Sequence, residues 1–217
     1  MIQSERILFQ DEHLLVVNKL SGELVVAGKG KIEKLPLLDF LKKDFPGLRA
    51  VHRLDFETSG VVVFAKTKAA QAAFLDTKFD HWKKIYHTLV MGMMPQKKGA
   101  IRIPLPARDK GTVEAETLYT VRELFANSSY VEVEITTGRH HQIRKHFAAI
   151  NHPLVLDALY GHKKFNSTFT QEFGYRRFFL HAAVAEFDHP ITGMKTRIEA
   201  PVPKQFADVL KRLRELR

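Results

Sequence analysis

Two short segments contain most of the residue types that could do chemistry. The first, residues 52–60, has the sequence HRLDFETSG and places Arg53 and Asp55 in a predicted turn that ends in small polar residues. A rigid scaffold can present such a loop for binding or catalysis. The plainer interpretation is an ordinary turn, in which Asp55 accepts hydrogen bonds from backbone amides and Arg53 lies on the surface.

The second segment, residues 136–144, has the sequence TTGRHHQIR and leads from a predicted strand into a predicted helix. Gly138 permits an unusual backbone conformation there. The amides at the helix start, together with Arg139 and Arg144, favour an anion such as a phosphate or a carboxylate. A helix start with a solvated basic face stays the alternative, although like charges this close in sequence repel one another.

The elements that must position these segments follow from hydrophobic periodicity and turn residues. A short helix over residues 36–43 precedes the first segment, and a β-branched strand over residues 61–65 follows it. Thr67 is suited to cap an alanine-rich helix over residues 68–82. The second segment follows a predicted hairpin and opens a predicted helix, at residues 113–124, 130–136 and 139–150.

The rest of the chain continues in the same style. Further strands are predicted at residues 7–9, 14–17, 85–91, 178–187 and 194–200, and a basic amphipathic helix begins near Pro203. Strands joined mainly by hairpins, with helices inserted, indicate an α+β protein with a mixed, largely antiparallel central sheet and flanking helices. Because the chain has no internal repeat or long linker, residues 1–217 are expected to form a single domain.

Composition restricts the function classes. The chain has 217 residues, 45% of them apolar, so it can bury a sizeable core. Its net charge of +10 favours a polyanionic partner such as nucleic acid, although an anionic membrane or plain solubility would give the same sign. The absence of cysteine excludes disulfides, thiolate nucleophiles and zinc sites built on sulfur. Without a secretory signal or a long apolar run, the protein is expected to be cytoplasmic and independent of membranes.

Four motifs, in order along most of the chain, resemble the RluA family of RNA pseudouridine synthases. The family signature H-R-L-D-x-x-T-S-G is complete at residues 52–60, and T-G-R-x-H-Q-I/L-R is complete at residues 137–144. K-x-Y occurs at residues 84–86 and L-H-A at residues 180–182. The chain departs from the family at Leu20, where proline is usual. The resemblance implies a pseudouridine synthase fold and an isomerase that converts uridine to pseudouridine in RNA with no metal and no organic cofactor.

The resemblance also implies the roles of individual residues. Asp55 matches the catalytic aspartate, which attacks the flipped uridine, and Arg144 matches the arginine that pairs with this aspartate and orients it. Tyr86 matches the aromatic residue that stacks on the target base and helps to move the proton at C5. Arg53 matches the arginine that fills the gap left by the flipped base, and Ile143 matches the apolar residue on the base's other side. Further substrate-binding candidates in the same motifs are His52, Thr58, Arg139, His141 and Gln142.

The RNA target stays open between two interpretations. Many family members carry an N-terminal S4-type RNA-binding module, whereas this chain is expected to begin with the first strand of the catalytic domain, as is more typical of members that modify tRNA. The segments at residues 160–166, 177–182 and 197–201 favour members that act on large-subunit ribosomal RNA. A monomer is expected to bind RNA through phosphate contacts from predicted loops, at Arg102, Arg108, Lys110, Lys163, Lys164, Arg176 and Arg177.

Other function classes compete with this hypothesis. A noncatalytic RNA-binding module on the same fold would share the basic charge, but it would have no physical need to keep Asp55, Tyr86 and Arg144. A nuclease or phosphodiesterase would need clustered carboxylates for metal ions, which Asp55 and Glu57 alone do not supply. A metal site in the histidine-rich stretch at residues 140–152 would lack a recognised ligand spacing.

Overall fold

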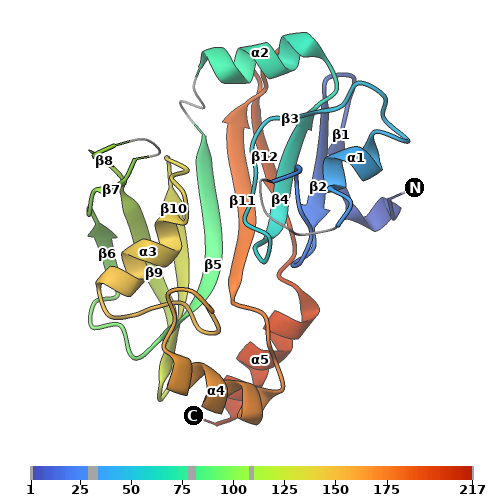
Figure 1. Ribbon diagram of the computed structural model, residues 1–217. Coiled ribbons are helices and arrows are strands. Elements are labelled where there is room, and N and C mark those ends of the chain that lie inside the picture. Colours follow the sequence, from blue (N-terminus) through green and yellow to red (C-terminus); the bar gives the residue numbers. More distant parts are fainter. Residues whose placement is uncertain (1, 29–33, 78–81, 108–109, 217) are drawn as a thin grey trace. The chain divides into compact units, whose positions relative to one another are not determined.

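The computed structural model describes residues 2–28, 34–77, 82–107 and 110–216, and Figure 1 shows the course of the chain. These residues contain five α-helices and twelve strands, which confirms the α+β class. The contacts divide the chain into two compact units, so the expected single domain stays a prediction. Unit 1 comprises Met1–Lys84 and Ala182–Pro201, and unit 2 comprises Ile85–His181 and Val202–Arg217. Arg108, a predicted phosphate contact, lies outside the described residues.

The strands of unit 1 follow the order β1–β2–β4–β11, with β3 paired to β4 and β12 paired to β11. The pairs β1–β2, β2–β4, β3–β4 and β11–β12 are antiparallel, which confirms the hairpins predicted near both ends of the chain. The strand bounds are Ile7–Gln10 for β1, Leu14–Lys19 for β2, Arg49–Ala50 for β3, Ser59–Ala65 for β4, Leu180–Asp188 for β11 and Lys195–Glu199 for β12. The helices of this unit are a 3-10 turn at Ser4–Arg6, α1 at Leu37–Leu41 and α2 at Lys68–Asp76.

The core of unit 1 forms around β4, all seven residues of which are buried. An uninterrupted apolar run suits a strand that is covered on both faces. Phe74 of α2 packs in this core with Trp82 and Phe187, and the rings of Trp82 and Phe187 stack with centroids 4.9 Å apart. Thr67 caps α2 as predicted, because its Oγ1 accepts a hydrogen bond from the Ala70 amide at 3.2 Å. The helix was predicted to run to residue 82, but α2 ends at Asp76 with Thr77 as its C-cap, and Trp82 packs in the core. Residues 78–81 of the predicted helix lie outside the described residues.

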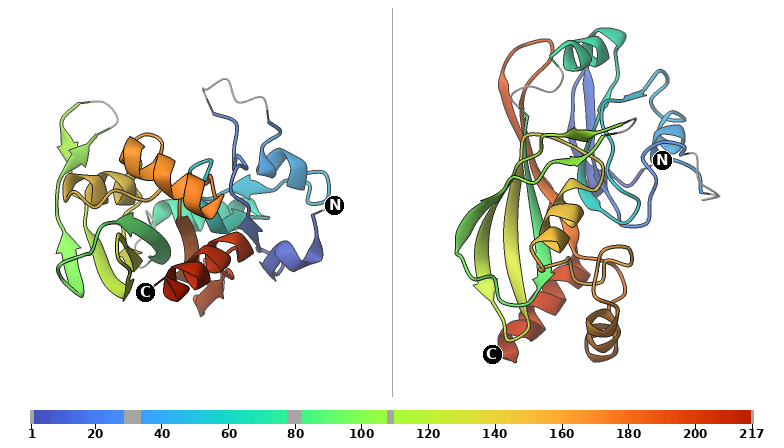
Figure 2. Two further views of the ribbon diagram at one scale, coloured as in Figure 1. Left: turned by 90° about the horizontal axis from the view of Figure 1, so that it is seen from below. Right: turned by 60° about the vertical axis from the view of Figure 1, so that its left-hand side comes forward.

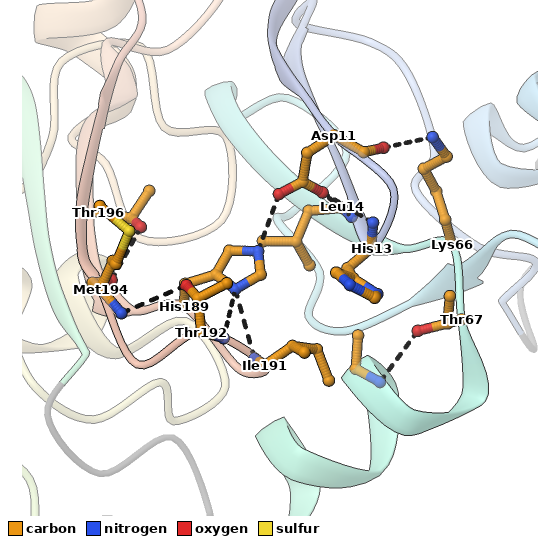
Figure 3. A network of polar contacts seen from close by, with 11 residues as sticks. Asp11, His13, Leu14, Lys66, Thr67, His189, Ile191, Thr192, Met194 and Thr196 are labelled. Carbon is orange, nitrogen blue, oxygen red and sulfur yellow. Dashed lines mark hydrogen bonds and ion pairs between the residues drawn. The ribbon is translucent and has the colours of Figure 1, made fainter.

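A polar network ties the turn after β1 to the turn between β11 and β12 within unit 1 (Figure 3). One oxygen of Asp11 accepts the backbone amides of His13 and Leu14 at 2.8 and 2.7 Å, and the other lies 2.9 Å from Nε2 of His189. Nδ1 of His189 accepts the backbone amide of Thr192 at 3.1 Å, so the ring proton must sit on Nε2 and be donated to Asp11. Two turns that are far apart in sequence are thereby joined through one buried imidazole.

The strands of unit 2 follow the order β5–β10–β9–β6, beside a small antiparallel pair, β7–β8. The β9–β10 pairing is antiparallel and confirms the predicted hairpin, although the strand expected from residue 113 is split into β8 and β9. Helix α3 lies against β9 in Figure 1 and in the right-hand view of Figure 2. The strand bounds are Lys83–Met91 for β5, Lys98–Ile101 for β6, Leu105–Pro106 for β7, Thr112–Val113 for β8, Thr117–Leu124 for β9 and Ser128–Ile135 for β10.

Three helices complete unit 2: α3 at Gln142–Ala149, α4 at Lys163–Phe173 and α5 at Lys204–Glu215. The sequence predicts a loop where α4 lies, so the placement of Lys163 and Lys164 in loops is wrong. The helix forms because Nδ1 of His162 caps it by accepting the Phe165 amide at 3.1 Å. Phenylalanines recur every fourth residue along its inner face, at 165, 169 and 173, and stack on one another. Within the described ranges, no helix is both long enough and apolar enough to cross a membrane.

Candidate active site

The loop that carries Asp55 lies in unit 1 between β3 and β4. Strand β3 intervenes between the predicted helix and this loop, so the loop connects two strands rather than a helix and a strand. Burial alternates along it: Arg53 is exposed, Leu54 is buried and Asp55 is half-buried. The Thr58 amide donates to the carbonyl oxygen of Asp55 at 3.2 Å and closes a turn around the carboxylate.

The feature that holds this loop is a fully buried lysine that the sequence analysis did not single out. Nζ of Lys19, at the end of β2, donates to the carbonyl oxygens of Leu20, Phe56 and Thr58 at 3.1, 3.0 and 2.6 Å. Burial lowers the pKa of Lys19 to about 7, and the negative charges of Glu23 and Asp55 oppose this decrease. The only sequence signal was a lysine at the end of the apolar strand LLVVNK, where a buried cation requires acceptors.

His52, Thr58 and Gly60 shape the loop from inside unit 1. Nε2 of His52 accepts the Val63 amide at 3.0 Å, and burial lowers the pKa of this ring to about 3, so the histidine is neutral. Thr58 is 2% exposed, and its Oγ1 has no hydrogen-bond partner among the described residues. Gly60 has φ +114° and faces the backbone of Ala182, where any Cβ would overlap it. The glycine of the first motif is therefore required for a close approach to the backbone of the L-H-A motif.

The second set of predicted site residues lies in unit 2, and the structure describes each set within its own unit. Tyr86 is buried in β5, and Ile143 and Arg144 are buried in the first turn of α3. This helix begins at Gln142, later than predicted, because His141 adopts the left-handed conformation with φ +54°. The unusual backbone expected at Gly138 therefore occurs at His141 instead.

Arg144 forms a buried, bidentate ion pair with Asp157. Its Nε and Nη2 donate to the two carboxylate oxygens at 2.6 and 2.9 Å, and its guanidinium lies 4.9 Å from the ring centre of Phe178 and 5.1 Å from that of Tyr160. Burial raises the pKa of Asp157, but the hydrogen bonds from Arg144 and from the Tyr160 amide outweigh burial and hold it below its usual value. Asp157 was not predicted from sequence, because a single aspartate in a loop has no signal without its partner.

Gln142 and His146 anchor the start of α3 to β9. The amide nitrogen of Gln142 donates to the Glu116 carbonyl and to Oγ1 of Thr117 at 2.8 and 3.2 Å, and its oxygen accepts the Arg139 amide at 3.1 Å. Nδ1 of the buried His146 lies 2.8 Å from the same Thr117 oxygen. Gln142 is 3% exposed and bonds groups within unit 2, and its predicted contact with substrate stays a prediction.

The remaining predicted contacts lie at the surface of the same turn. Arg139 is exposed, and the rings of His140 and His141 stack with centroids 3.8 Å apart. Nδ1 of the half-buried His141 lies 3.1 Å from the Tyr160 hydroxyl. Across the described part of the chain, no three histidine or acidic side chains are grouped closely enough to hold a metal ion.

Comparison with known proteins identifies the family to which this sequence is similar. The family described as RNA pseudouridylate synthase matches residues 13–149, which include Asp55, Tyr86 and Arg144. A protein of Vibrio cholerae named ribosomal large subunit pseudouridine synthase C is 33% identical over 96% of this chain and 69% of its own length. A Xylella fastidiosa protein named ribosomal large subunit pseudouridine synthase D is 36% identical over the same shares.

A solved structure bears out the fold. The human RNA pseudouridylate synthase domain containing 4 superposes with a TM-score of 0.79 and 26% identity, over 96% of this chain and 92% of its own. This match confirms the pseudouridine synthase fold that the four motifs predict. By family match, by sequence identity over nearly its whole length and by fold, the chain belongs to the RNA pseudouridylate synthase family.

Proposed function

We propose that this chain is an RNA pseudouridine synthase that acts on large-subunit ribosomal RNA and uses Asp55 as its nucleophile. The observation that carries the proposal is the Asp55 loop, whose neighbouring carbonyls are held by Lys19 while Asp55 itself stays half-buried. The relatives described above are named for the large ribosomal subunit, and this favours ribosomal RNA over the tRNA alternative.

The proposed reaction is an isomerisation that conserves every atom of the uridine. The carboxylate of Asp55 attacks the flipped nucleotide, and the bond between C1′ and N1 breaks. The base turns, C5 bonds to C1′ as the bond between C1′ and the Asp55 carboxylate breaks, and the carboxylate is released. C5 then loses its proton and N1 gains one, so atoms and charge balance. No electrons are gained or lost, so the reaction requires no redox cofactor.

Arg144 and Tyr86 supply the other groups that this chemistry requires. Arg144 would hold the Asp55 carboxylate ionised and oriented. Its Nε and Nη2 donate to the two carboxylate oxygens of Asp157, and this bidentate pair fixes the plane of the guanidinium. The ring of Tyr86 would stack on the base and assist proton movement at C5.

Arg53 is proposed to fill the space that the flipped uridine leaves in the RNA stack. The side chain is exposed while its neighbour Leu54 is buried, so the loop points the guanidinium toward solvent. Flipping costs a few kcal/mol, and a planar cation that stacks between bases offsets part of that cost. Replacing Arg53 by alanine should slow the formation of the flipped complex.

The experiment that tests the proposal is pseudouridine mapping on total RNA from cells with and without this gene, with a carbodiimide adduct that stalls reverse transcription. We expect one or a few marks in large-subunit ribosomal RNA to disappear with the gene. Expression of the wild-type chain should restore these marks, whereas the Asp55→Asn variant should not.

The runner-up, a noncatalytic RNA-binding module, predicts a different outcome. It predicts no change in any mark, and purified protein would add none to unmodified ribosomal RNA or tRNA. Binding of the Asp55→Asn variant to RNA serves as the control, because affinity that rests on phosphate contacts should survive this substitution. Restoration of the marks by that variant would refute the assignment of Asp55.

A further inference from the structure

Two cavities in unit 2 share one exposed cation, Arg176. The first has a volume of about 420 Å³ and is lined by residues from the end of α4, the following loop and α5. The second has a volume of about 470 Å³ and is lined mainly by α4 and by Asp157. Figure 1 and the left-hand view of Figure 2 place α4 and α5 side by side. We call the lining of both cavities the α4–α5 surface.

Cations dominate the first cavity of this surface. Its charged lining consists of Arg176, Arg177 and Arg212 against one carboxylate, Asp208. Arg212 is fixed in place, because its Nη2 donates to the Glu172 carbonyl at 2.9 Å and its Nη1 to the Phe173 carbonyl at 3.3 Å. Arg176 and Asp208 make no hydrogen bond or ion pair with any described side chain. Arg176 therefore displays a positive charge that no described side chain neutralises.

An aromatic side chain lies among these cations. Tyr175 also lines the first cavity and is half-buried, with its ring centre 4.6 Å from that of Phe179. Burial raises the pKa of the Tyr175 phenol, and the positive charge of Arg177, which lines the same cavity, opposes this rise. Arginines beside an aromatic ring suit a polynucleotide, which presents phosphates and base faces together.

The second cavity connects this surface to the proposed catalytic residues. Its lining includes Asp157, the carboxylate that holds Arg144, together with Lys163 and Arg176. Polar side chains from the exposed face of α4, Asn166, Ser167, Thr170 and Gln171, complete it. An RNA strand that runs from Asp157 along the second cavity would meet Lys163 and Arg176. It would then reach the other arginines of the first cavity.

We propose that the α4–α5 surface is a second RNA-contact site, which binds the phosphodiester backbone of nucleotides flanking the target uridine. The inference rests on the proposed function, because it takes RNA as the partner. It goes further by naming the surface that positions the flanking RNA through Arg176, Arg177 and Tyr175. It also assigns Asp208 an opposing effect, since a carboxylate in the same cavity repels phosphate.

Filter binding to a large-subunit ribosomal RNA transcribed without modifications tests the proposal. The dissociation constant is measured between about 50 and 200 mM salt for the wild type, Arg176→Ala and Asp208→Asn. We expect Arg176→Ala to raise Kd roughly two- to fivefold, as loss of an exposed charge contact does. The slope of log Kd against log salt should fall by about 0.7 to 0.9, which corresponds to one phosphate contact. Asp208→Asn should change Kd in the opposite direction.

Arg122→Ala is the matched control, because it removes the same charge from unit 2 at a cation that is paired with Glu132. Its Kd and salt slope should stay at the wild-type values. If Arg176→Ala has no larger effect than this control, or if Asp208→Asn weakens binding, the proposal is overturned. Pseudouridine formation by the wild-type chain is measured in parallel. This measurement distinguishes an active enzyme whose α4–α5 surface does not contribute to RNA binding from a chain with no activity.

Discussion

The Asp55 loop of unit 1 and the start of α3 in unit 2 are held by different kinds of contact. The loop is held through its backbone: the Lys19 ammonium donates to the Phe56 and Thr58 carbonyl oxygens, and the Gly22 amide donates to the Phe56 carbonyl at 2.8 Å. The start of α3 is held through its side chains, with Gln142 bonded to β9 and Arg144 bonded to Asp157.

The difference has a consequence for the side chains that do chemistry. A loop that is anchored by its carbonyls can present Arg53 and Asp55 without using either as a structural support. In α3 the guanidinium of Arg144 is both a proposed catalytic group and half of a buried ion pair. We therefore expect substitutions at the anchors of α3 to reduce stability, and substitution of the anchor of the Asp55 loop to reduce turnover.

The largest expected loss of stability follows from Asp157→Ala. Arg144 is 7% exposed, so the substitution leaves a buried guanidinium without its bidentate carboxylate. Removing one partner of a buried pair costs about 3 to 5 kcal/mol of the free energy of unfolding. Urea unfolding followed by circular dichroism measures the loss, and Arg122→Ala, which breaks an exposed pair, should cost no more than about 1 kcal/mol. Equal losses for the two variants would mean that α3 does not depend on its ion pair.

Lys19→Met should separate turnover from stability. Misplacing a catalytic group costs up to about 100-fold in kcat, and we expect a loss of that order because the Phe56 and Thr58 carbonyls of the Asp55 loop lose their common donor. The stability change should be small, since the lost hydrogen bonds are offset by removal of a buried charge. Lys19→Arg keeps the charge and should recover part of the turnover. Wild-type kcat in Lys19→Met would show that the Asp55 loop keeps its conformation without the hydrogen bonds from Lys19.

Because Lys19 titrates, both stability and turnover should depend on pH, and they should change in opposite directions. Its pKa of about 7 lies below its ordinary value of 10.5, so the unfolded chain binds this proton more tightly. Between these values stability should rise with pH, and the slope should be lower in Lys19→Met. Turnover should instead fall as pH rises, because a neutral amine has only two N–H donors for three carbonyls. An alkaline limb of the same size in both variants would rule out Lys19 as its source.

The sequence predicts the motif residues of the Asp55 loop and of α3 better than it predicts the residues that hold them in place. The motif residues Asp55 and Arg144 were identified from sequence, and the strand and helix that follow each motif were predicted. Lys19 and Asp157, which hold them, were missed because each acts through tertiary contacts that local patterns do not encode. The helix α4 was missed for a related reason, because its phenylalanine spacing lies in a stretch whose lysines and polar residues resemble a loop.

Gln142→Ala tests whether the hydrogen-bonded anchor of α3 matters as much as the ionic one. The amide is buried and bonds the Glu116 carbonyl and Thr117, so its loss leaves buried groups unsatisfied, at about 1 to 3 kcal/mol of the free energy of unfolding. The same urea titration measures it, with the exposed Gln171→Ala as the matched control, for which no change is expected. If Gln142→Ala lowers the free energy of unfolding as much as Asp157→Ala does, the ionic anchor of α3 contributes no more than the hydrogen-bonded one.

The smallest effect is expected at Asp11, which lies in unit 1 but belongs to the His189 network instead of the Asp55 loop. Burial raises the pKa of Asp11, but amide hydrogen bonds and His189 lower it further, so it lies below its ordinary value of 3.8. The carboxylate therefore contributes stability above that value, and the contribution is lost as pH falls through the depressed pKa. Its side chain is 32% exposed, so Asp11→Asn should cost only about 0.5 to 1 kcal/mol near pH 7 and less near pH 3. Turnover should be unchanged, because this network does not anchor the catalytic loop. A drop in kcat comparable to that of Lys19→Met would mean that the carbonyl contacts of Lys19 are not what sets the position of Asp55.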